Sequence, residues 1–471
     1  LLGNLTGSSQ FFNSDAFYNG VATQSLRFDD AGDHYLTRQS SGAPNFGAGN
    51  QKTWTVSMWV KRTSFGTTRQ LLTTIVNNSE EFNIYISGGE LFSAGDQNYT
   101  LRQSTALLRD PASWYHLVVR CDTTQGTASD RLRLYTNGVE GGETDGTSNI
   151  SQNADLGLLG NLNHYIGTRS NGTMQFDGYI AEMNVADGTS YPPTAFGETK
   201  NGVWIPKEFT GSYGNQGWHL EFLNTSINNS GANGSSSTVG ADTSGNGNHW
   251  QAEGITASDC AMPDSPENNF CTMNPIDNYN TGVTYSEGSL RWTIGGNDGA
   301  GRSTFIMTSG KWYVEFYRKT SIDYIGVVSG NADITTVNGT QTVFYAGDGT
   351  KRVNGSSSSY GASYANGDII SIALNMDDEE VTFYKNNASQ GTISLTSVGN
   401  EGYGVSPASG TGSTVATANF GQDGSFSGDV TAQGNTDGNG IGDFYYAPPS
   451  GYLALCSANL PEPTIGPNSA T

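Results

Sequence analysis

The stretch Trp54-Thr-Val-Ser-Met-Trp-Val-Lys61 alternates between apolar and polar residues with a period of two. Successive side chains of a β-strand leave opposite faces of the sheet, so this alternation predicts a half-buried strand. Trp59 is the one large apolar residue among the otherwise polar, outward-facing positions. The residues expected to face the core are Trp54, Val56, Met58 and Val60.

The composition favours an all-β protein of several domains. Gly accounts for 63 of the 471 residues, 11% of residues are aromatic and only 14% are charged. Abundant Gly indicates many turns, and the aromatic residues supply apolar area for cores. The sequence shows no amphipathic helical pattern of three or more turns. Because the chain is long for one core, we expect two or three domains.

The charge balance is strongly acidic. Lys and Arg number 22 against 44 Asp and Glu, which gives a net charge of 22 − 44 = −22. Nucleic acids and anionic membranes need a basic face, so we expect neither as a partner. Apolar runs stay far below the ~18 residues that span a bilayer, so we also expect no membrane insertion. The chain begins with Leu1 and ends in a Pro-rich stretch, and we expect a fragment of a longer product.

Four cysteines cannot define a disulfide framework in a chain of this size. Cys121 and Cys456 lie in strand-like runs, which favours small core residues. Cys260 and Cys271 lie eleven residues apart in a loop-like stretch rich in Pro and Asn. They could form a bridge, but two free thiols are the preferred interpretation.

Several motifs in the first part of the chain follow one another in a known order. They are Tyr35 after an acidic turn, Trp114-Tyr-His116, Tyr135-Thr-Asn-Gly138 and Phe176-Asp-Gly-Tyr-Ile180. Asn137-Gly138 by itself predicts a hairpin, because a type I′ turn needs positive φ at both central residues. This succession resembles a laminin-G-like, concanavalin-A-like jelly roll. The resemblance implies an antiparallel sandwich over residues 25–200.

A second resemblance covers residues 286–456. Trp312, Val314 and Phe316 alternate with polar or aromatic neighbours, and the run 370–374 forms another inward ladder. The stretches Ser309–Phe316, Tyr324–Val328, Gly367–Leu374, Val381–Asn386 and Asn419–Gly421 together resemble a SPRY β-sandwich with a C-terminal extension. SPRY domains are binding modules without chemistry, which is what this resemblance implies here.

Residues 201–285 are expected to form a loop-rich connector. The connector contains strand-like Trp218–Phe222 and the element Asp242-Thr-Ser-Gly-Asn-Gly-Asn-His-Trp250. In laminin-G-like domains such an element usually precedes the first strands, whereas here it follows the closing strand. We therefore expect 218–250 to fold back onto one sandwich. The remaining ranges are an irregular segment at 1–24 and a Pro-rich linker at 457–471.

The order of these parts resembles virion proteins of marine tailed bacteriophages. The family implies a tail-fibre, appendage or capsid-surface protein, located on the virion and extracellular. Its expected partners are other virion proteins and a host-surface glycan or protein, and a homo-oligomer is expected. Two alternatives stay open. One is a structural decoration or connector protein whose sandwiches bind neighbouring subunits, and the other is a secreted bacterial lectin.

Enzymatic motifs are missing from the sequence. Concanavalin-A-like glycosidases need two carboxylates alternating on one strand. Here Glu80 and Glu81 are adjacent, and Glu182 has only Asp187 nearby. The five histidines stand singly, with no zinc-binding spacing, and neither a Gly-x-Ser-x-Gly elbow nor a phosphate loop occurs. We expect a non-enzymatic protein with no catalytic residues.

Calcium is the one candidate cofactor. Two segments rich in Asn, Asp and Gly resemble calcium loops, and the acidic turn at 29–33 is a third candidate. The first segment fits the full spacing, whereas the second fits the first nine positions and has Tyr446 in place of the final Glu. Neither segment is flanked by helical patterns, and tight turns with Asn and Gly in left-handed conformations explain the same composition. The candidate ligands are Asp242, Ser244, Asn246 and Glu253 in one loop and Asn435, Asp437, Asn439 and Asp443 in the other.

Aromatic residues in turn-rich stretches are candidates for stacking on sugar rings. Simple packing explains a lone surface aromatic equally well. The candidate ligand-binding residues are Trp59, Tyr99, Tyr191, Tyr213 and Tyr360.

Overall fold

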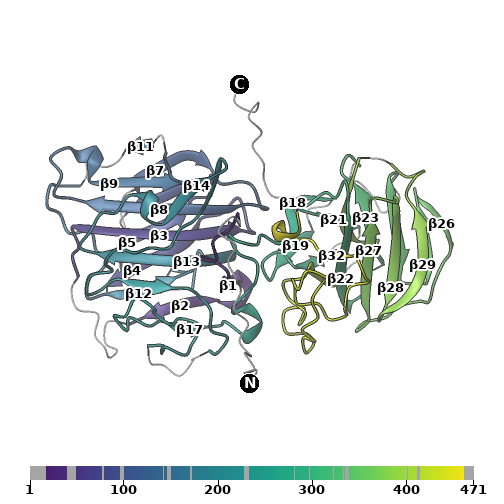
Figure 1. Ribbon diagram of the computed structural model, residues 1–471. Helices are drawn as coiled ribbons and strands as arrows, with labels where there is room; N and C mark the ends of the chain where they lie inside the picture. The colour runs from purple at the N-terminus through teal and green to yellow at the C-terminus, as the bar shows by residue number, and fades with distance from the viewer. Residues whose placement is uncertain are drawn as a thin grey trace, which may run out of the picture.

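The computed structural model shows two β-sandwiches side by side (Figure 1). It describes residues 17–39, 49–76, 79–95, 100–141, 143–145, 150–169, 172–227, 233–279, 282–295, 298–321, 323–332, 334, 339–399, 401–410 and 414–460, with backbone alone at 76, 79–81 and 143–145. The expected linker beyond residue 460, most of the expected N-terminal segment and Tyr99 lie outside these residues. The described residues form strands and short 3-10 turns without an α-helix, so the all-β prediction is confirmed. In this described part of the chain there is also no helix that could cross a membrane.

The first sandwich consists of a seven-stranded and an eight-stranded antiparallel sheet. The seven-stranded sheet has the order β1 (Leu26–Phe28), β13 (Gly178–Asp187), β3 (Thr53–Arg62), β8 (Trp114–Asp122), β9 (Leu132–Thr136) and β10 (Val139–Glu140), and β16 (Trp218–Leu220) also pairs with β13. The eight-stranded sheet has the order β11 (Glu143–Asp145), β7 (Thr100–Leu107), β6 (Leu91–Gly95), β5 (Ser79–Ile86), β4 (Arg69–Val76), β12 (Asn163–Ile166), β2 (Tyr35–Arg38) and β17 (Gln251–Glu253). The predicted inward residues of β3 all lie in the core between these sheets.

The connector extends both sheets of the first sandwich. Strand β16 pairs with β13, and β17 pairs with β2. Phe222 and Trp250 are 2% and 0% exposed within the first core, so the predicted fold-back of this segment is confirmed. A separate hairpin of β14 (Gly197–Lys200) and β15 (Val203–Pro206) precedes β16 and passes in front of β8 in Figure 1. The four cysteines are free and buried.

The second sandwich also has two antiparallel sheets. One has the order β18 (Met273–Tyr279), β21 (Gly299–Ser303), β30 (Tyr403–Ser409), β23 (Tyr324–Ser329), β24 (Thr342–Ala346), β25 (Thr350–Val353) and β26 (Ser356–Ser359). The other has the order β19 (Val283–Ser286), β20 (Arg291–Ile294), β31 (Thr414–Asn419), β22 (Lys311–Thr320), β27 (Ile369–Asn375), β28 (Glu380–Lys385) and β29 (Ala388–Ser394), with β32 (Leu453–Ala454) parallel to β22. The ladders predicted from Trp312 and from the run 370–374 face each other in register across β22 and β27 and line this core.

A buried carboxylate attaches the C-terminal extension to the second sandwich. Glu315 on β22 is fully buried and accepts hydrogen bonds from the backbone N–H groups of Tyr445 and Tyr446 at 2.9 and 2.8 Å. Burial raises the pKa of Glu315 to about 7, although these hydrogen bonds favour the charged form. Phe444 packs against Tyr313 on the same strand face. The extension therefore covers the outer face of this sheet.

One buried arginine joins the two sandwiches. Arg27 on β1 is fully buried and forms ion pairs with Asp259 of the connector and with Asp423 and Glu287 of the second sandwich, at 2.9, 3.0 and 3.3 Å. Close by, the Tyr179 hydroxyl donates to the Gly288 carbonyl at 3.1 Å. A charge removed from water needs such partners, so these contacts fix how the sandwiches meet.

Candidate functional site

The outer face of β3 in the seven-stranded sheet is covered, contrary to the prediction of a half-buried strand. On β3 the outward residues Thr55, Ser57 and Lys61 are each at most 1% exposed. Trp204 of β15 lies over Trp59, which is itself only 3% exposed. The prediction that Trp59 stacks on a sugar is therefore wrong, because solvent does not reach its ring. Its outward position was instead the signal of a second packing layer.

Beneath this cover, a Ser–His pair resembles a nucleophile and its base. Ser57 Oγ lies 2.8 Å from His116 Nε2. However, the Trp204 indole donates to His116 Nδ1 at 2.9 Å, so in the neutral ring the proton is on Nε2. That nitrogen then donates to Ser57 and cannot take its proton. Burial lowers the pKa of His116 to about 3, which keeps the ring neutral.

Two of the predicted aromatic residues come together beside this cover. Tyr191 and Tyr213 both contact Phe209 edge-on, with ring centroids 5.0 and 4.9 Å apart. The two tyrosines are half-buried, and Tyr213 donates its hydroxyl proton to Asn184 at 2.6 Å. Tyr360 belongs to the second sandwich, where its ring packs on Tyr345. The predicted aromatic set is thus split between the two domains.

A carboxylate–imidazole pair lies next to Tyr213. Glu182 sits at a bulge of β13 with φ 47° and bonds His219 Nε2 at 2.6 Å. Burial opposes protonation of His219, but the hydrogen bond and charge of Glu182 outweigh it and raise the pKa of His219. Because Glu182 and His219 come from β13 and β16, the pair attaches the connector to the sheet. Neither side chain lines the pockets described below.

The first calcium candidate is a turn organised by one buried aspartate. Asp242 Oδ1 accepts the N–H groups of His219 and Ser244, both at 2.9 Å, and Oδ2 accepts that of Asn248 at 2.7 Å. Asn246 donates to the carbonyls of Gly214 and Gly217, and Glu253 accepts a hydrogen bond from Gln251. Both oxygens of Asp242 are therefore already used in the turn.

The second calcium candidate has the same arrangement. Asp437 Oδ1 accepts the N–H groups of Asn439 and Ile441, and Oδ2 accepts that of Ala454, each at 2.9 Å. Asn435 bonds the Tyr445 carbonyl. Asp443 accepts the N–H of Gly424 at 3.2 Å.

No cluster of three His, Cys, Asp or Glu side chains suited to a metal occurs within the described ranges. In the third candidate turn, Asp29 Oδ1 likewise accepts the N–H of Ala31. Calcium at any of the three turns stays a prediction.

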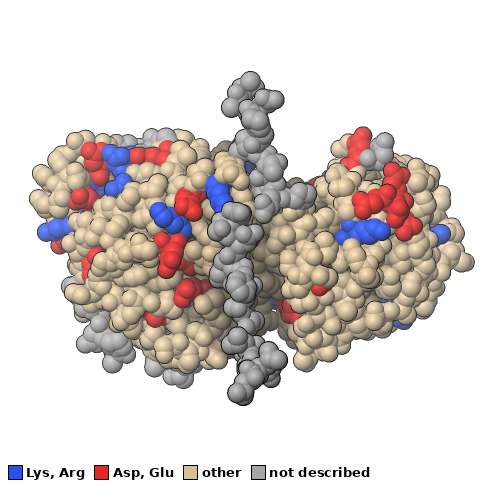
Figure 2. All heavy atoms as spheres, viewed as in Figure 1, with Lys and Arg blue, Asp and Glu red and all other residues tan. Residues whose placement is uncertain are grey.

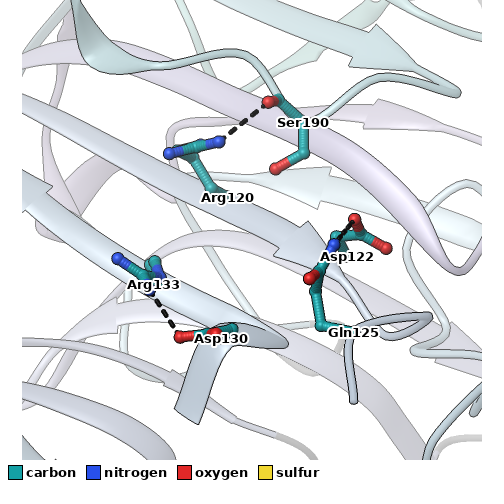
Figure 3. Close-up of a pocket in the computed structure, with 6 residues that line it drawn as sticks. All are labelled: Arg120, Asp122, Gln125, Asp130, Arg133 and Ser190. Atoms are coloured by element: carbon teal, nitrogen blue, oxygen red, sulfur yellow. Dashed lines mark hydrogen bonds and ion pairs between the residues drawn. The ribbon is translucent and has the colours of Figure 1, made fainter. Parts of the chain in front are cut away.

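An open pocket of about 380 Å³ lies at one end of the seven-stranded sheet. Figure 3 shows Arg120 and Arg133 on one side of it and Asp122 with Gln125 on the other. Asp130 and Ser190 complete the lining. The residues come from β8, from β9 with the turn before it, and from the loop after β13. No sequence pattern indicated this pocket, because Arg120 and Ser190 lie 70 residues apart.

The outer face of the eight-stranded sheet carries uncharged polar residues in two cross-strand rows. Strand register aligns Tyr165 with Thr73 and Thr73 with Asn83, and it aligns Tyr85 with Ser93. Their sequence neighbours, such as Leu72 and Ile84, face the core, so these residues point outward. We call this set the polar rows: Thr37, Tyr165, Thr73 and Asn83, and Gln70, Tyr85, Ser93 and Gln103.

The polar rows suit hydroxyl-rich ligands. Their amide and hydroxyl groups both donate and accept hydrogen bonds, as sugar hydroxyls do. Tyr85 and Tyr165 are half-exposed and offer flat apolar rings with a polar tip. Thr37, Gln70, Thr73, Asn83 and Ser93 are at most 4% exposed, so the two tyrosines and Gln103 are the accessible part of the polar rows. Single strands could not reveal the rows, because the register between strands creates them.

Comparison with known proteins matches two parts of the chain to family models. Residues 30–191 match the concanavalin A-like lectin/glucanases superfamily, and residues 311–423 match the SPRY domain. Among the curated proteins no sequence shows significant similarity to this chain.

The chain is also similar to solved structures of other proteins. The SPRY domain of human HERC1 is 18% identical, with 31% of this chain and 96% of that chain covered and a TM-score of 0.28. A heptameric SAP-like pentraxin from Limulus polyphemus is 14% identical, with 36% and 73% covered and a TM-score of 0.26. Neither likeness bears on a ligand. The chain therefore contains a concanavalin A-like domain and a SPRY domain, each folded as a β-sandwich.

Proposed function

We propose that this chain is a non-enzymatic surface protein of a tailed-phage virion that binds glycans on the host. The polar rows are the observation that supports this proposal best. They place half-exposed tyrosines among uncharged donors and acceptors on one face of a lectin-like domain. The net charge of −22 disfavours nucleic acid, whose phosphates require a basic face. On the face shown in Figure 2, acidic and basic residues gather in small mixed groups.

Glycan-array binding by the whole chain tests the proposal. The variant Tyr165→Ala removes one ring from the polar rows, and Tyr446→Ala removes a half-exposed ring from the second sandwich. We expect Tyr165→Ala to weaken array binding by about tenfold, the value of roughly 1.4 kcal/mol, whereas Tyr446→Ala leaves it unchanged. Thermal unfolding checks that both variants are folded at the temperature of the assay. Absence of glycan binding by the wild type, or equal loss in both variants, contradicts the proposal.

A structural role in the virion is the second candidate, and an apolar groove favours it. Phe305, Ile306, Met307 and Trp312 line a groove of about 240 Å³ on the second sandwich, together with Leu455 and Leu460. Ile306 and Leu460 are 37% and 41% exposed, which is unusual for large apolar side chains placed together. A neighbouring virion subunit would bury this groove. A map of the assembled particle with the groove in solvent contradicts this role.

The remaining parts of the proposal concern assembly. The virion surface is the proposed location, and other virion proteins and a host-surface glycan or protein are the proposed partners. The chain is proposed to form a homo-oligomer. Light scattering of the purified chain checks the oligomer, since a mass near 49.9 kDa corresponds to one copy.

A further inference from the structure

The two arginines of the pocket in Figure 3 differ in their counter-ions. Arg133 forms ion pairs with Asp130 and with Glu140, the latter at 2.9 Å, and these partners raise the pKa of Arg133. Arg120 instead donates to the Tyr135 hydroxyl at 3.2 Å and the Ser190 carbonyl at 3.0 Å. Its Nε makes no hydrogen bond, and it forms no ion pair with a described carboxylate. Arg120 is therefore a cation without a paired anion.

Asp122, a pocket carboxylate that lies within the electrostatic influence of Arg120, is already hydrogen-bonded. Asp122 accepts from the N–H and hydroxyl of Thr124 at 3.1 and 2.6 Å and from the Gln125 amide at 2.5 Å. Partial burial would raise the pKa of Asp122, but these hydrogen bonds outweigh it and, with the charge of Arg120, lower the pKa. The pocket thus presents a guanidinium with spare N–H donors beside ionised carboxylates that still have accepting lone pairs.

This arrangement selects a ligand with an anionic group next to hydroxyl groups. A simple anion would meet Arg120 but also face Asp122 and Asp130. A neutral sugar would bond the carboxylates but leave Arg120 without a counter-ion. A uronic acid satisfies both, because a planar carboxylate matches the fork of a guanidinium and ring hydroxyls can donate to carboxylates.

We propose that this pocket binds a uronic acid residue of a glycan, with its carboxylate at Arg120 and its hydroxyls at Asp122 and Asp130. The inference rests on the proposed function, since the ligand is a glycan, but it adds a second site on the sheet opposite the polar rows. The net charge of −22 repels an anionic glycan at long range. Physiological salt screens that repulsion beyond about 8 Å, so the local guanidinium decides binding.

Calorimetric titration of the whole chain with three oligosaccharides tests the inference. These are oligogalacturonate, the same oligomer with its carboxyl groups methyl-esterified, and a sulfated galactose oligomer that also carries anions and hydroxyls. We expect the wild type to bind oligogalacturonate about tenfold more tightly than the ester. A hydrogen bond between charged groups contributes enough binding free energy for this ratio. Equal affinity for the ester overturns the inference without any variant. Equal affinity for the sulfated oligomer overturns the assignment to a uronic acid.

Variants then locate the site. Arg120→Gln should abolish the preference for oligogalacturonate over the ester, and Arg120→Lys should keep part of it. Lys52→Gln makes the same change of charge at an exposed position of the same sandwich and should keep all of it. Unchanged preference in Arg120→Gln overturns the inference. If Tyr165→Ala still lowers neutral-glycan binding in that case, the proposed function stands, whereas absence of all glycan binding overturns both.

Discussion

The two sheets of the first sandwich differ in whether solvent reaches their largest outward side chains, although Thr37, Gln70, Thr73, Asn83 and Ser93 of the polar rows are at most 4% exposed. On the seven-stranded sheet Ser57 and Lys61 are at most 1% exposed under the connector. On the eight-stranded sheet Tyr85 and Tyr165 are half-exposed. Both sets follow the same period of two along their strands. The period therefore reports which face a residue occupies, but not whether that face meets water.

Charge distinguishes the two faces further. The covered face carries Arg27 and Lys61, and each has carboxylate partners from the connector or the second sandwich. The polar rows contain no charged residue. Burying an unpaired charge is costly, so charges at a covered face require partners that arrive with the cover. Charged residues that ordinarily indicate solvent exposure are here the contacts between layers.

Among variants that test this contrast, Arg27→Leu at the covered face should cause the largest loss of stability. The substitution leaves Asp259 and Asp423 buried without this cation, so we expect the free energy of unfolding to fall by about 3–5 kcal/mol. Urea unfolding measures the loss. The matched control is Arg133→Leu, whose half-exposed ion pairs should contribute less than about 1 kcal/mol. Equal losses in the two variants would show that Arg27 does not hold the sandwiches together.

Lys61→Met should have the next largest effect, lowering the free energy of unfolding by about 3 kcal/mol. Lys61 and Asp264 are both fully buried and 2.8 Å apart, and Lys61 also donates to the Phe270 carbonyl. Burial raises the pKa of Asp264 even with Lys61 present. Without Lys61 the pKa should rise further, so the variant should lose stability relative to the wild type as pH rises above about 4, the ordinary value. The second change Asp264→Asn should recover part of the loss, and a pH-independent deficit would contradict this account.

Trp204→Ala uncovers the buried His116 and should lower the free energy of unfolding by about 2 kcal/mol. This is less than the loss expected on removing a fully buried Trp. In the wild type His116 has a pKa of about 3, so the unfolded chain binds the extra proton below about pH 6.5. Stability from this group is therefore lost as pH falls from about 6.5 to 3. In the variant, NMR titration should find the pKa of His116 moved toward its ordinary value. A pKa still near 3 would mean that Trp204 is not the cover.

Calcium should have the smallest effect. The loop of Asp242 joins the two strands by which the connector extends both sheets, and its carboxylate already accepts three backbone N–H groups. We expect the melting temperatures in calcium and in EDTA to agree within about 2 °C. This is less than the shift that a change of about 1 kcal/mol in the free energy of unfolding would cause in a domain of this size. Asp242→Asn should lower the melting temperature equally in both. A clear rise on adding calcium would instead establish the predicted metal site.

Local pattern predicted much of the fold because the forces involved are local or repeat along one strand. The inward ladder of β3 and that of Trp312, Val314 and Phe316 both line cores, as expected. The Asn137-Gly138 turn has φ of 49° and 78°, as a type I′ hairpin requires. Prediction of the site was poorer. Tyr191 and Tyr213 do meet, through Phe209, but Trp59 is buried.

The sequence by itself determined which residues face a core and where the chain turns, since periodicity and turn chemistry act over a few neighbours. Only the tertiary structure decided which outward face is covered, because Trp204 reaches His116 across 88 residues and Asp264 reaches Lys61 across 203. It also placed Arg120, which has no carboxylate partner among the described residues, beside Asp122 in a pocket that Ser190 completes. Strand register and long-range packing create these surfaces, and neither is written in any single stretch of the chain.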